Sequence, residues 1–508
     1  MRVTIIDLVT EGPATDPFSR VMNANFASIM PQMAGAWCEQ LGHHVHYECY
    51  TGFEDLPAML NDGADIVFIS GFTRSALTAY AISNLYRRRG AVTVLGGPHA
   101  RCYPEDAAKY FDYVLGFTDR TVIEDILKDC APHRPEGMIV SAANQPTSLP
   151  SLESRWRFVA ANMAKAPLMK IVPMIASTGC PYTCAFCIDS TVDYQPLGFD
   201  QMEEDLRFLA KHAPGVKVGW HDPNFGIRFD DYLGAIERAV PPRKLKHIAE
   251  SSLALLSEAN LKRMKNVGFE AILPGVESWY DFGNKSKARV ASGEAKVKQL
   301  AEHVNTILRY ILFVQTNFVL GLDSDAGAEP FELTKKFVDL VPGAYPAFSM
   351  FTCYGRAAPM NLGLQKAGRI LPFPFLFLDS TRSMNVRPLN YTWEDFYEKN
   401  TDLVRHAWTG ARVWKRFLAN THLTTRFLNV IRAVSSMRVR HQTQLQALLK
   451  SDASMKRYYE GESAVLPMFY RAKIAQSLGS LYAALPDGAV DHDPYAYLHS
   501  TGAAAAAE

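Results

Sequence analysis

The sequence predicts an α/β protein in three parts: a Rossmann-like N-terminal domain, a partial (β/α)6 barrel and a helical C-terminal region. Its 508 residues are enough for about three domains. Strand-like and helix-like hydrophobic periodicities alternate in two separate series, which is typical of βαβ units with parallel sheets. After about residue 387 the strand signals fade and helical periodicity continues alone.

The first series, residues 1–130, predicts the Rossmann-like domain. It opens with the apolar run RVTIIDL at 2–8, which a Gly-containing stretch separates from a helical pattern over 26–41. Further strands are expected at 44–47, 65–70, 91–95 and 113–115, and further helices at 56–60, 75–89 and 122–127. Right-handed crossovers between these strands would make the sheet parallel.

The second series, residues 170–386, predicts the barrel. A connection over 131–169 precedes it, because five prolines interrupt that segment and no hydrophobic period is visible. Strands are then expected at 171–176, 216–220, 245–250, 271–277, 314–322 and 347–351. Six units are too few for an eight-fold barrel but suit a partial one, in which chemistry occurs at the C-terminal ends of the strands.

Residues 387–501 are predicted to form the helical region, and 502–508 (GAAAAAE) are set aside as a tail. Between 401 and 460 eleven Lys and Arg stand against three Asp and Glu. A solvated basic face is the usual explanation of such an excess. A site for an acidic substrate, a membrane surface or a partner is the alternative.

Composition limits the classes of partner. The 53 basic and 52 acidic residues leave a net charge of +1, so no nucleic-acid partner is expected. No apolar run reaches the roughly 18 residues of a spanning helix, so no membrane span is expected. Eight unevenly spaced cysteines argue against a disulfide framework and for a reducing compartment, so a cytoplasmic location is expected.

Three cysteines are clustered. Cys180, Cys184 and Cys187 occur in STGCPYTCAFC, directly after the strand expected at 171–176. Three thiolates within eight residues, on a loop that contains Gly and Pro, can point at one iron-sulfur cluster. A zinc site would normally use a second CxxC pair, and none follows. With three protein ligands, a [4Fe-4S] cluster keeps one iron open.

This C-x3-C-x2-C motif, with Phe186 just before its last cysteine, resembles the signature of the radical S-adenosylmethionine (radical SAM) superfamily. The resemblance implies that the open iron chelates the amino and carboxylate groups of S-adenosylmethionine. It also implies that one electron from the cluster cleaves the sulfonium to a 5′-deoxyadenosyl radical. A chance arrangement or a zinc site is the remaining interpretation.

The resemblance assigns further cofactor-binding positions. Glu277 ends the fourth barrel strand, where the superfamily places a polar or acidic group on the ribose, and a carboxylate accepts two hydroxyl hydrogen bonds. The Gly-Gly-Glu contact to the methionyl amine is missing, and Asp222 lies instead in a D-x-x-F variant. Glu250 is the other candidate carboxylate, and Asn317 opens the segment expected beside the adenine. Helix capping or surface exposure is the alternative for Asp222, Glu250 and Glu277.

The first domain resembles the cobalamin-binding domain of one radical SAM subclass. The Asp-x-His-x-x-Gly loop of such domains corresponds to residues 7–12, where Val9 replaces the histidine. If cobalamin binds, its cobalt takes no imidazole from this loop. The segments expected along the nucleotide tail contain Ser70, Phe72, Ser75, Gly96 and Gly97. Arg74, in the first of these segments, is a candidate for packing near the lower cobalt face, and a surface salt bridge is the alternative. His99 is expected to contact the tail or solvent. A domain that kept the fold and lost cobalamin is the alternative.

The predicted function is methyl transfer to a carbon, or less readily phosphorus, of a small or secondary metabolite. The resemblance implies S-adenosylmethionine, a [4Fe-4S] cluster, cobalamin and an external electron donor of the flavodoxin or ferredoxin type. Cyclisation, ring contraction or oxidation with the same cofactors is the alternative, and a sensor without turnover is a third hypothesis. The tRNA methylthiotransferases are disfavoured, because the first-strand loop has no cysteine.

Cys353 follows the sixth barrel strand, on the face where chemistry is expected. It could donate hydrogen, bind substrate or fill space. The isolated cysteines of the first domain are more simply explained as buried thiols.

Overall fold

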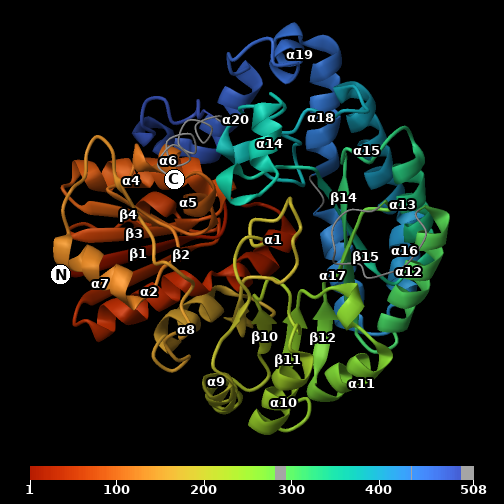
Figure 1. The fold of residues 1–508 in the computed structure, drawn as a ribbon, viewed down its shortest axis with the longest axis horizontal. Coiled ribbons are helices and arrows are strands. Elements are labelled where there is room, and N and C mark those ends of the chain that lie inside the picture. The colour runs from red at the N-terminus through yellow and green to blue at the C-terminus, as the bar shows by residue number, and fades with distance from the viewer. Residues whose placement is uncertain (281–292, 436–437, 494–508) are drawn as a thin grey trace, which may run out of the picture.

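The computed structural model describes residues 1–280, 293–435 and 438–493. Figure 1 shows the N-terminal domain in red and orange, the barrel from yellow to green, and the C-terminal helices in blue around the barrel and above it. The tail at 502–508 lies outside the described residues.

The first domain is a parallel six-stranded sheet in the order β2-β1-β3-β4-β5-β6. Its strands are β1 (Arg2–Leu8), β2 (His44–Tyr50), β3 (Ile66–Gly71), β4 (Val92–Gly96), β5 (Tyr113–Leu115) and β6 (Met138–Val140). Apolar residues fill both faces of β1 and β3, as expected for a strand covered on both sides. The sequence prediction of a parallel α/β domain is confirmed.

Helices cover both faces of this sheet. The helical elements are α1 (Pro17–Met22), η1 (Asn23–Phe26), α2 (Ile29–Gln40), α3 (Leu56–Met59), η2 (Thr73–Ser75), α4 (Ala76–Arg88), α5 (Pro98–Cys102), α6 (Pro104–Ala108) and α7 (Arg120–Asp129). Helices α2 and α7 share one apolar core with the sheet, and α4 shares the other. Asp119 caps α7 by accepting a hydrogen bond from the Val122 amide.

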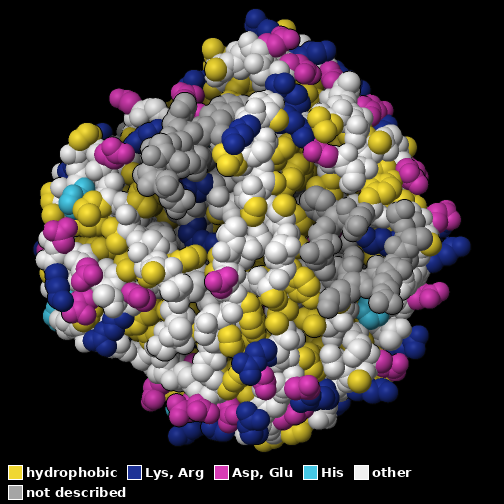
Figure 2. All heavy atoms as spheres, viewed as in Figure 1, with side chains coloured by type: hydrophobic (Ala, Val, Ile, Leu, Met, Phe, Trp, Pro, Cys, Tyr) yellow, Lys and Arg dark blue, Asp and Glu magenta, His cyan; other side chains and the backbone are white. Residues whose placement is uncertain are grey.

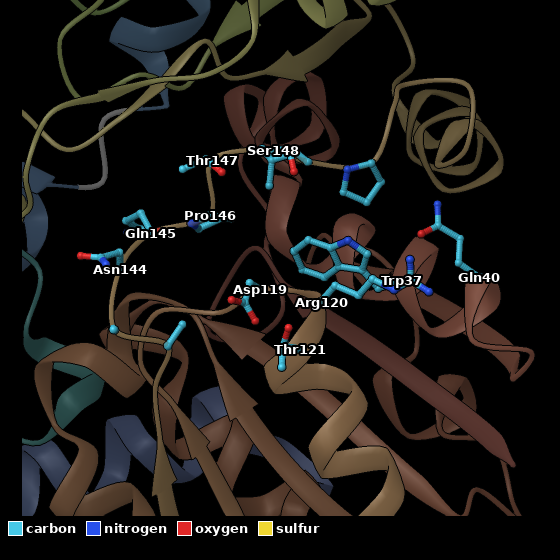
Figure 3. Close-up of a pocket in the computed structure, with 14 residues that line it drawn as sticks. Trp37, Gln40, Asp119, Arg120, Thr121, Asn144, Gln145, Pro146, Thr147 and Ser148 are labelled. Atoms are coloured by element: carbon cyan, nitrogen blue, oxygen red, sulfur yellow. The ribbon is translucent and has the colours of Figure 1, made fainter.

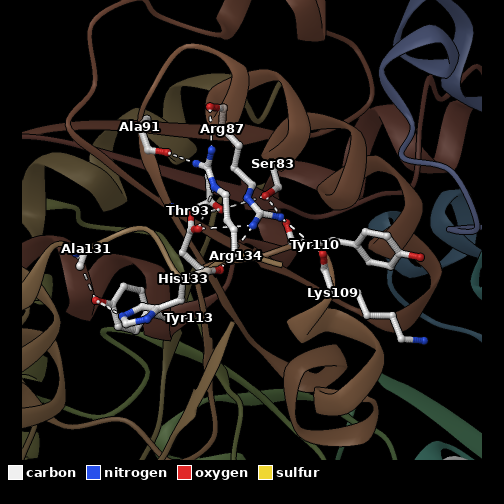
Figure 4. A network of polar contacts seen from close by, with 11 residues as sticks. Ser83, Arg87, Ala91, Thr93, Lys109, Tyr110, Tyr113, Ala131, His133 and Arg134 are labelled. Atoms are coloured by element: carbon white, nitrogen blue, oxygen red, sulfur yellow. Dashed lines mark hydrogen bonds and ion pairs between the residues drawn. The ribbon is translucent and has the colours of Figure 1, made fainter. Parts of the chain in front are cut away.

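The expected connection over 131–169 contains regular structure, namely β6 and α8 (Trp156–Lys165). Strand β6 has the apolar sequence MIV, but three residues are too few to show a hydrophobic period, and proline-interrupted sequence surrounds them. Arg134 anchors the segment by donating to the buried Asp112 carboxylate at 3.2 Å and to the Ala91 carbonyl (Figure 4). Arg87 approaches the same carboxylate, so two guanidiniums compensate one buried charge.

The barrel is a parallel, open array in the order β7-β10-β11-β12-β14-β15, with β13 continuing β12. Its strands are β7 (Ile171–Met174), β10 (Lys217–Trp220), β11 (Lys246–Ala249), β12 (Phe269–Ile272), β13 (Gly275–Glu277), β14 (Phe313–Leu320) and β15 (Tyr345–Met350). A short hairpin, β8 (Ser177–Thr178) with β9 (Gln195–Pro196), follows β7. The predicted partial (β/α)6 barrel is confirmed.

Five helices alternate with the barrel strands. They are α9 (Phe199–His212), α10 (Phe229–Ala239), α11 (Glu258–Val267), α12 (Glu294–Ile307) and α13 (Glu329–Leu340), with η3 (Leu253–Leu255) before α11. Beyond β15 follow η4 (Gly355–Ala357), α14 (Asn361–Lys366) and η5 (Phe375–Phe377). Phe373, Phe375 and Phe377 are buried and belong to the main apolar core.

An open barrel has two edge strands, and other parts of the chain satisfy both. At β7, the Ile171 amide donates to Asn25 Oδ1 at 2.7 Å, and Arg155 donates to the Pro173 carbonyl. At β15, the Met350 amide donates to the Ser380 carbonyl. Just before β15, Arg416 donates to the Ala344 carbonyl. Residues of the first domain and of the C-terminal region therefore complete the barrel.

The C-terminal region is helical, as predicted: α15 (Trp393–Ala407), α16 (Gly410–Ala419), α17 (Leu423–Val434), α18 (Arg438–Ser451), α19 (Ala453–Tyr459), α20 (Met468–Leu478) and η6 (Gly479–Ala484). Much of its basic excess is paired or buried. Arg412 pairs with Asp339, Lys450 with Glu398, and Arg416 is buried. In Figure 2, basic and acidic side chains are interspersed around the rim of the visible face. No helix within the described ranges is long and apolar enough to cross a membrane.

Closure of the β7 edge can be tested with Asn25→Ala. The substitution leaves the buried Ile171 amide without its acceptor, which costs about 1–3 kcal/mol. We expect a lower Tm by scanning fluorimetry, while Asn305→Ala, which removes an exposed amide, leaves Tm unchanged. Equal Tm values for the wild type and Asn25→Ala would show that this edge does not need Asn25.

Candidate functional site

The cysteine loop leaves the C-terminal end of β7 and is closed at its base by the β8–β9 hairpin. The Cys180 amide donates to the Val192 carbonyl at 3.2 Å, so the loop returns to its starting point. Gly179 makes this closure possible. Its φ is 67°, and a Cβ there would lie 2.2 Å from the Asp193 carbonyl oxygen.

The three predicted ligands lie on this one loop. Cys180 and Cys184 are buried, Cys187 is partly exposed, and none forms a disulfide. The Cys187 amide donates to the Cys184 carbonyl at 2.9 Å, which places these two residues in one tight turn. Three thiols without a histidine among them suit an iron-sulfur cluster. Within the described ranges, the structure contains no group of three His, Cys, Asp or Glu side chains that could hold a metal ion.

Two other parts of the chain hold the loop. Arg101, on α5 of the first domain, donates to the Ile188 carbonyl at 2.9 Å and to Asp189 at 3.1 Å. From the far end of the barrel domain, the Met360 amide donates to the Ala185 carbonyl at 3.0 Å. The C-terminal edges of the first sheet and of the barrel therefore meet at the cysteine loop.

Asp222 also positions this loop. Its carboxylate accepts the Ser177 hydroxyl at 2.6 Å and the Ala176 amide at 3.1 Å, just before the first cysteine. Burial raises its pKa to about 6 despite these hydrogen bonds. The predicted contact of Asp222 with the methionyl amine stays a prediction. Glu250, in contrast, is exposed immediately after β11.

Glu277 ends β13 in a strained conformation. Its φ is 66°, in the left-handed region that few residues other than Gly adopt. Such strain is retained where the surrounding structure enforces it, and it occurs at ligand sites. On the neighbouring strand β14, Phe318 pairs in register with Glu277 and Asn317 with Gly275, and the backbone N–H of Asn317 donates to the Pro274 carbonyl. The residues predicted to contact the ribose and the adenine, Glu277 and Asn317, thus lie on the paired strands β13 and β14.

The other predicted region is the C-terminal edge of the first sheet. Asp7 lies opposite Cys49 and Ser70 and accepts the Ser28 amide at 2.7 Å, at the start of α2. Burial raises the Asp7 pKa to about 6, and its second oxygen has no hydrogen-bond partner. Val9 is buried and carries no ligating atom. This loop therefore fits a corrinoid bound without a loop imidazole.

The expected tail-binding segments lie side by side at this edge. A Cβ on Gly97 would come within 3.0 Å of the Gly71 oxygen and of Ser70 Oγ, so the loop after β4 packs directly on the loop after β3. Gly96 has more room, because a Cβ there would lie 3.9 Å from its nearest neighbour, Leu115 Cδ1. Phe72 is 45% exposed, whereas Ser75 is buried and donates to the Phe72 carbonyl.

The expectation for His99 is wrong. His99 is 1% exposed, contacts Tyr80 at 2.7 Å through Nε2, and packs on the rings of Tyr103 and Phe375. Burial lowers its pKa to about 3. It is a neutral core residue, because α5 turns its side chain into the apolar interior.

Arg74 belongs to a partly buried charge cluster, which we define as Glu11, Arg74, Asp379 and Arg382. Arg74 lies 3.5 Å from Glu11 and 3.6 Å from Asp379 and donates to the Val9 carbonyl, while Arg382 lies 2.5 Å from Glu11. Burial alone would raise the pKa of Asp379, but Arg382 and Arg74 lower it to about 2. The cluster joins the loop after β1 to the segment beyond the barrel.

Cys353 has the environment of a packing residue. It is 1% exposed, and burial raises its pKa far above the usual value. Asn385 fixes its backbone by accepting the Cys353 amide and donating to the Cys353 carbonyl, both at 2.9 Å. A catalytic role for this thiol stays a prediction.

One cavity lies away from these residues. It measures about 590 Å³ between Trp37 of α2, the start of α7 and residues 142–150 (Figure 3). None of the predicted site residues lines it.

Sequence reasoning did not single out Arg101, Asp379 or Arg382. Each acts through a contact with a distant part of the chain, and no local motif marks such a residue. A signal was available only for Arg101, which lies in the same loop-to-helix segment as the Gly96-Gly97 turn.

Two curated proteins of Chlorobaculum tepidum resemble this chain. Bacteriochlorophyllide d C-12(1)-methyltransferase is 21% identical over 366 residues, which cover 70% of this chain and 77% of that protein. Bacteriochlorophyllide d C-8(2)-methyltransferase is 25% identical over 225 residues, 42% of this chain and 50% of that protein. No family model matches the chain.

Two solved structures share the fold. The radical S-adenosylmethionine methyltransferase TsrM from Kitasatospora setae, with cobalamin and a [4Fe-4S] cluster bound, has a TM-score of 0.56 at 11% identity, covering 88% of this chain and 99% of that one. TsrM with tryptophan and a SAM analogue has a TM-score of 0.52 at 11% identity, over 74% and 78% of the two chains. In its cysteine motif, its order of domains and its overall fold, the chain is similar to these cobalamin-dependent radical SAM methyltransferases.

Proposed function

We propose that this chain transfers a methyl group from S-adenosylmethionine to a carbon atom of a small molecule, with a [4Fe-4S] cluster and cobalamin as cofactors. The observation that carries the proposal is the contact of Arg101 with the cysteine loop. This contact joins the cysteine loop, which is expected to hold the cluster, to the C-terminal edge of the first sheet, which is expected to hold cobalamin. When bound, these groups supply one-electron reduction and a carrier for the methyl group.

The chain's own residues hold and orient the reactants. Cys180, Cys184 and Cys187 would hold the cluster, and an iron without a protein ligand would be available to S-adenosylmethionine. The Glu277 carboxylate accepts the ribose hydroxyls, and Asn317 with its neighbours on β14 lies along the adenine. Gly179 and Asp222 position the cysteine loop through the contacts described above.

At the first sheet, the backbone around Gly97 and the exposed ring of Phe72 form the surface for the nucleotide tail. Val9 would offer no ligand to cobalt, and the partly buried charge cluster fixes Arg74 beside this loop. An external donor of the flavodoxin or ferredoxin type supplies the electrons. The names of the curated relatives support carbon as the methyl acceptor.

The test follows the fate of S-adenosylmethionine on the reduced holoenzyme. Methyl transfer yields S-adenosylhomocysteine, and we expect about one equivalent per bound cobalamin in the first turnover. The same protein without cobalamin should yield none. Cleavage to 5′-deoxyadenosine with no S-adenosylhomocysteine would instead favour cyclisation or oxidation, and no consumption at all would contradict both activities.

Two substitutions of Glu277 can separate the contribution of its carboxylate to S-adenosylmethionine binding from the effect of its strained backbone on stability. Glu277→Gln keeps the strained backbone and loses the charge, so we expect about tenfold weaker S-adenosylmethionine binding with unchanged Tm. Glu277→Gly should also weaken binding but raise Tm, because glycine relieves a strain of about 1 kcal/mol or more.

Both quantities are measured on cluster-loaded protein by equilibrium dialysis and scanning calorimetry. Glu302→Gln, on the exposed side of α12, is the matched control. Wild-type affinity in Glu277→Gln would exclude the ribose contact.

Arg101 should protect the cluster by fixing its loop. In Arg101→Met the contacts with Ile188 and Asp189 are lost, and we expect the cluster absorbance to bleach several-fold faster in air than in the wild type. Arg89→Met removes an exposed ion pair with Asp62 and should behave like the wild type. Identical bleaching rates for all three proteins would show that Arg101 does not support the loop.

A further inference from the structure

A row of polar side chains connects the C-terminal helices to the predicted S-adenosylmethionine strands. Arg432, on α17, donates to Gln315 Oε1 at 2.7 Å. Gln315 Nε2 donates to Asn317 Oδ1 at 2.7 Å, two residues further along β14. Asn317 Nδ2 lies 3.4 Å from the carbonyl oxygens of Leu273 and Pro274, directly before β13.

The guanidinium fixes the direction of every hydrogen bond in this row. Arginine can only donate, so the oxygen of the Gln315 amide must face Arg432. The nitrogen of that amide then faces Asn317 and requires its oxygen there. The Asn317 nitrogen is left for the two carbonyls, which can only accept. One cation therefore sets the orientation of two amides that could otherwise flip.

Arg432 is itself held by all three parts of the chain. Its guanidinium carbon lies 3.5 Å from the ring centre of Tyr345 on β15, 4.9 Å from that of Phe18 on α1 and 5.9 Å from that of Phe313 on β14. The Phe18 amide donates to Ser435 Oγ at 3.0 Å, which joins α1 to the end of α17. The position of Arg432 thus depends on the packing of the first domain and of the helical region against the barrel.

We propose that Arg432 is a positioning residue for S-adenosylmethionine and acts through Gln315 on Asn317 and on the entry to β13. This inference rests on the proposed function. The two carbonyls lie next to Gly275, at the start of the strand that Glu277 ends, so the row fixes both strands of the predicted nucleoside site. Packing of the outer domains is in this way linked to affinity for S-adenosylmethionine.

Two substitutions break the row at different points. Arg432→Met keeps the apolar stem and removes the donor. Gln315→Glu keeps an acceptor for Arg432, now as an ion pair, but presents a second acceptor to Asn317 Oδ1. A purely structural role for Arg432 predicts little effect of Gln315→Glu. The proposed role predicts that Asn317 reorients and that binding weakens.

The probe is S-adenosylhomocysteine, which cannot donate a methyl group, and its Kd is measured by calorimetry on cluster-loaded protein. We expect five- to tenfold weaker binding for Gln315→Glu and Arg432→Met, with unchanged iron content. Arg432→Lys, also a pure donor, should recover most of the affinity. Arg426→Met, on the same helix, removes a donor to the Asn420 carbonyl and serves as the control with wild-type affinity.

Wild-type Kd values in Gln315→Glu would overturn the proposal, whether or not Arg432→Met folds. If the wild-type protein bound S-adenosylmethionine but none of the variants differed from it, only the role of Arg432 would fail. A wild-type protein that loads its cluster and binds neither nucleoside would overturn the proposed function itself.

Discussion

The arrangement of the three parts of this chain depends on the two open edges of its six-stranded barrel, whose backbone groups need hydrogen-bond partners. A closed barrel pairs all of its strands, whereas this one ends at β7 and β15 with backbone groups that must find other partners. Asn25 and Arg155 satisfy β7, and the Ser380 carbonyl satisfies β15. Because these groups come from segments before and after the barrel, the barrel is complete only with its neighbours in place.

This constraint also brings the predicted cofactor positions together. Once the first domain lies against β7, its α5 reaches the cysteine loop, and Arg101 contacts that loop directly. The segment that follows β15 brings Asp379 and Arg382 to the loop after β1. The C-terminal edges of two parallel sheets, where ligands of such sheets bind, therefore face one shared region.

Charges in this region are compensated in pairs. Glu11 and Asp379 are buried with two guanidiniums, so the junction carries no net charge from these four side chains. Asp7 differs, because burial raises its pKa to about 6 and only the Ser28 amide compensates it. It keeps the place of the aspartate in the histidine-containing motif although Val9 has replaced the histidine, and its hydrogen bond holds the start of α2.

The sequence was sufficient to predict those elements that are determined by a local sequence pattern. Apolar runs located the six barrel strands and five strands of the first sheet, and cysteine spacing marked the loop after β7. Strand β6 was not predicted, since three residues are too few to show a period. The environment of His99 was predicted wrongly, because a Gly-Gly turn does not reveal that the following helix α5 directs the His99 side chain into the core. Arg432 and Asp379 could not be found from the sequence, because their roles depend on contacts between distant segments.

The central claim is that one chain holds an iron-sulfur cluster and cobalamin at the meeting point of its two sheets. The most direct measurement is the iron and cobalt content after anaerobic reconstitution with iron, sulfide and hydroxocobalamin, followed by desalting. We expect about four iron and about one cobalt per chain, with no imidazole signature on cobalt. Four iron without cobalt would contradict the role of the first domain, and the absence of both metals would contradict the whole account.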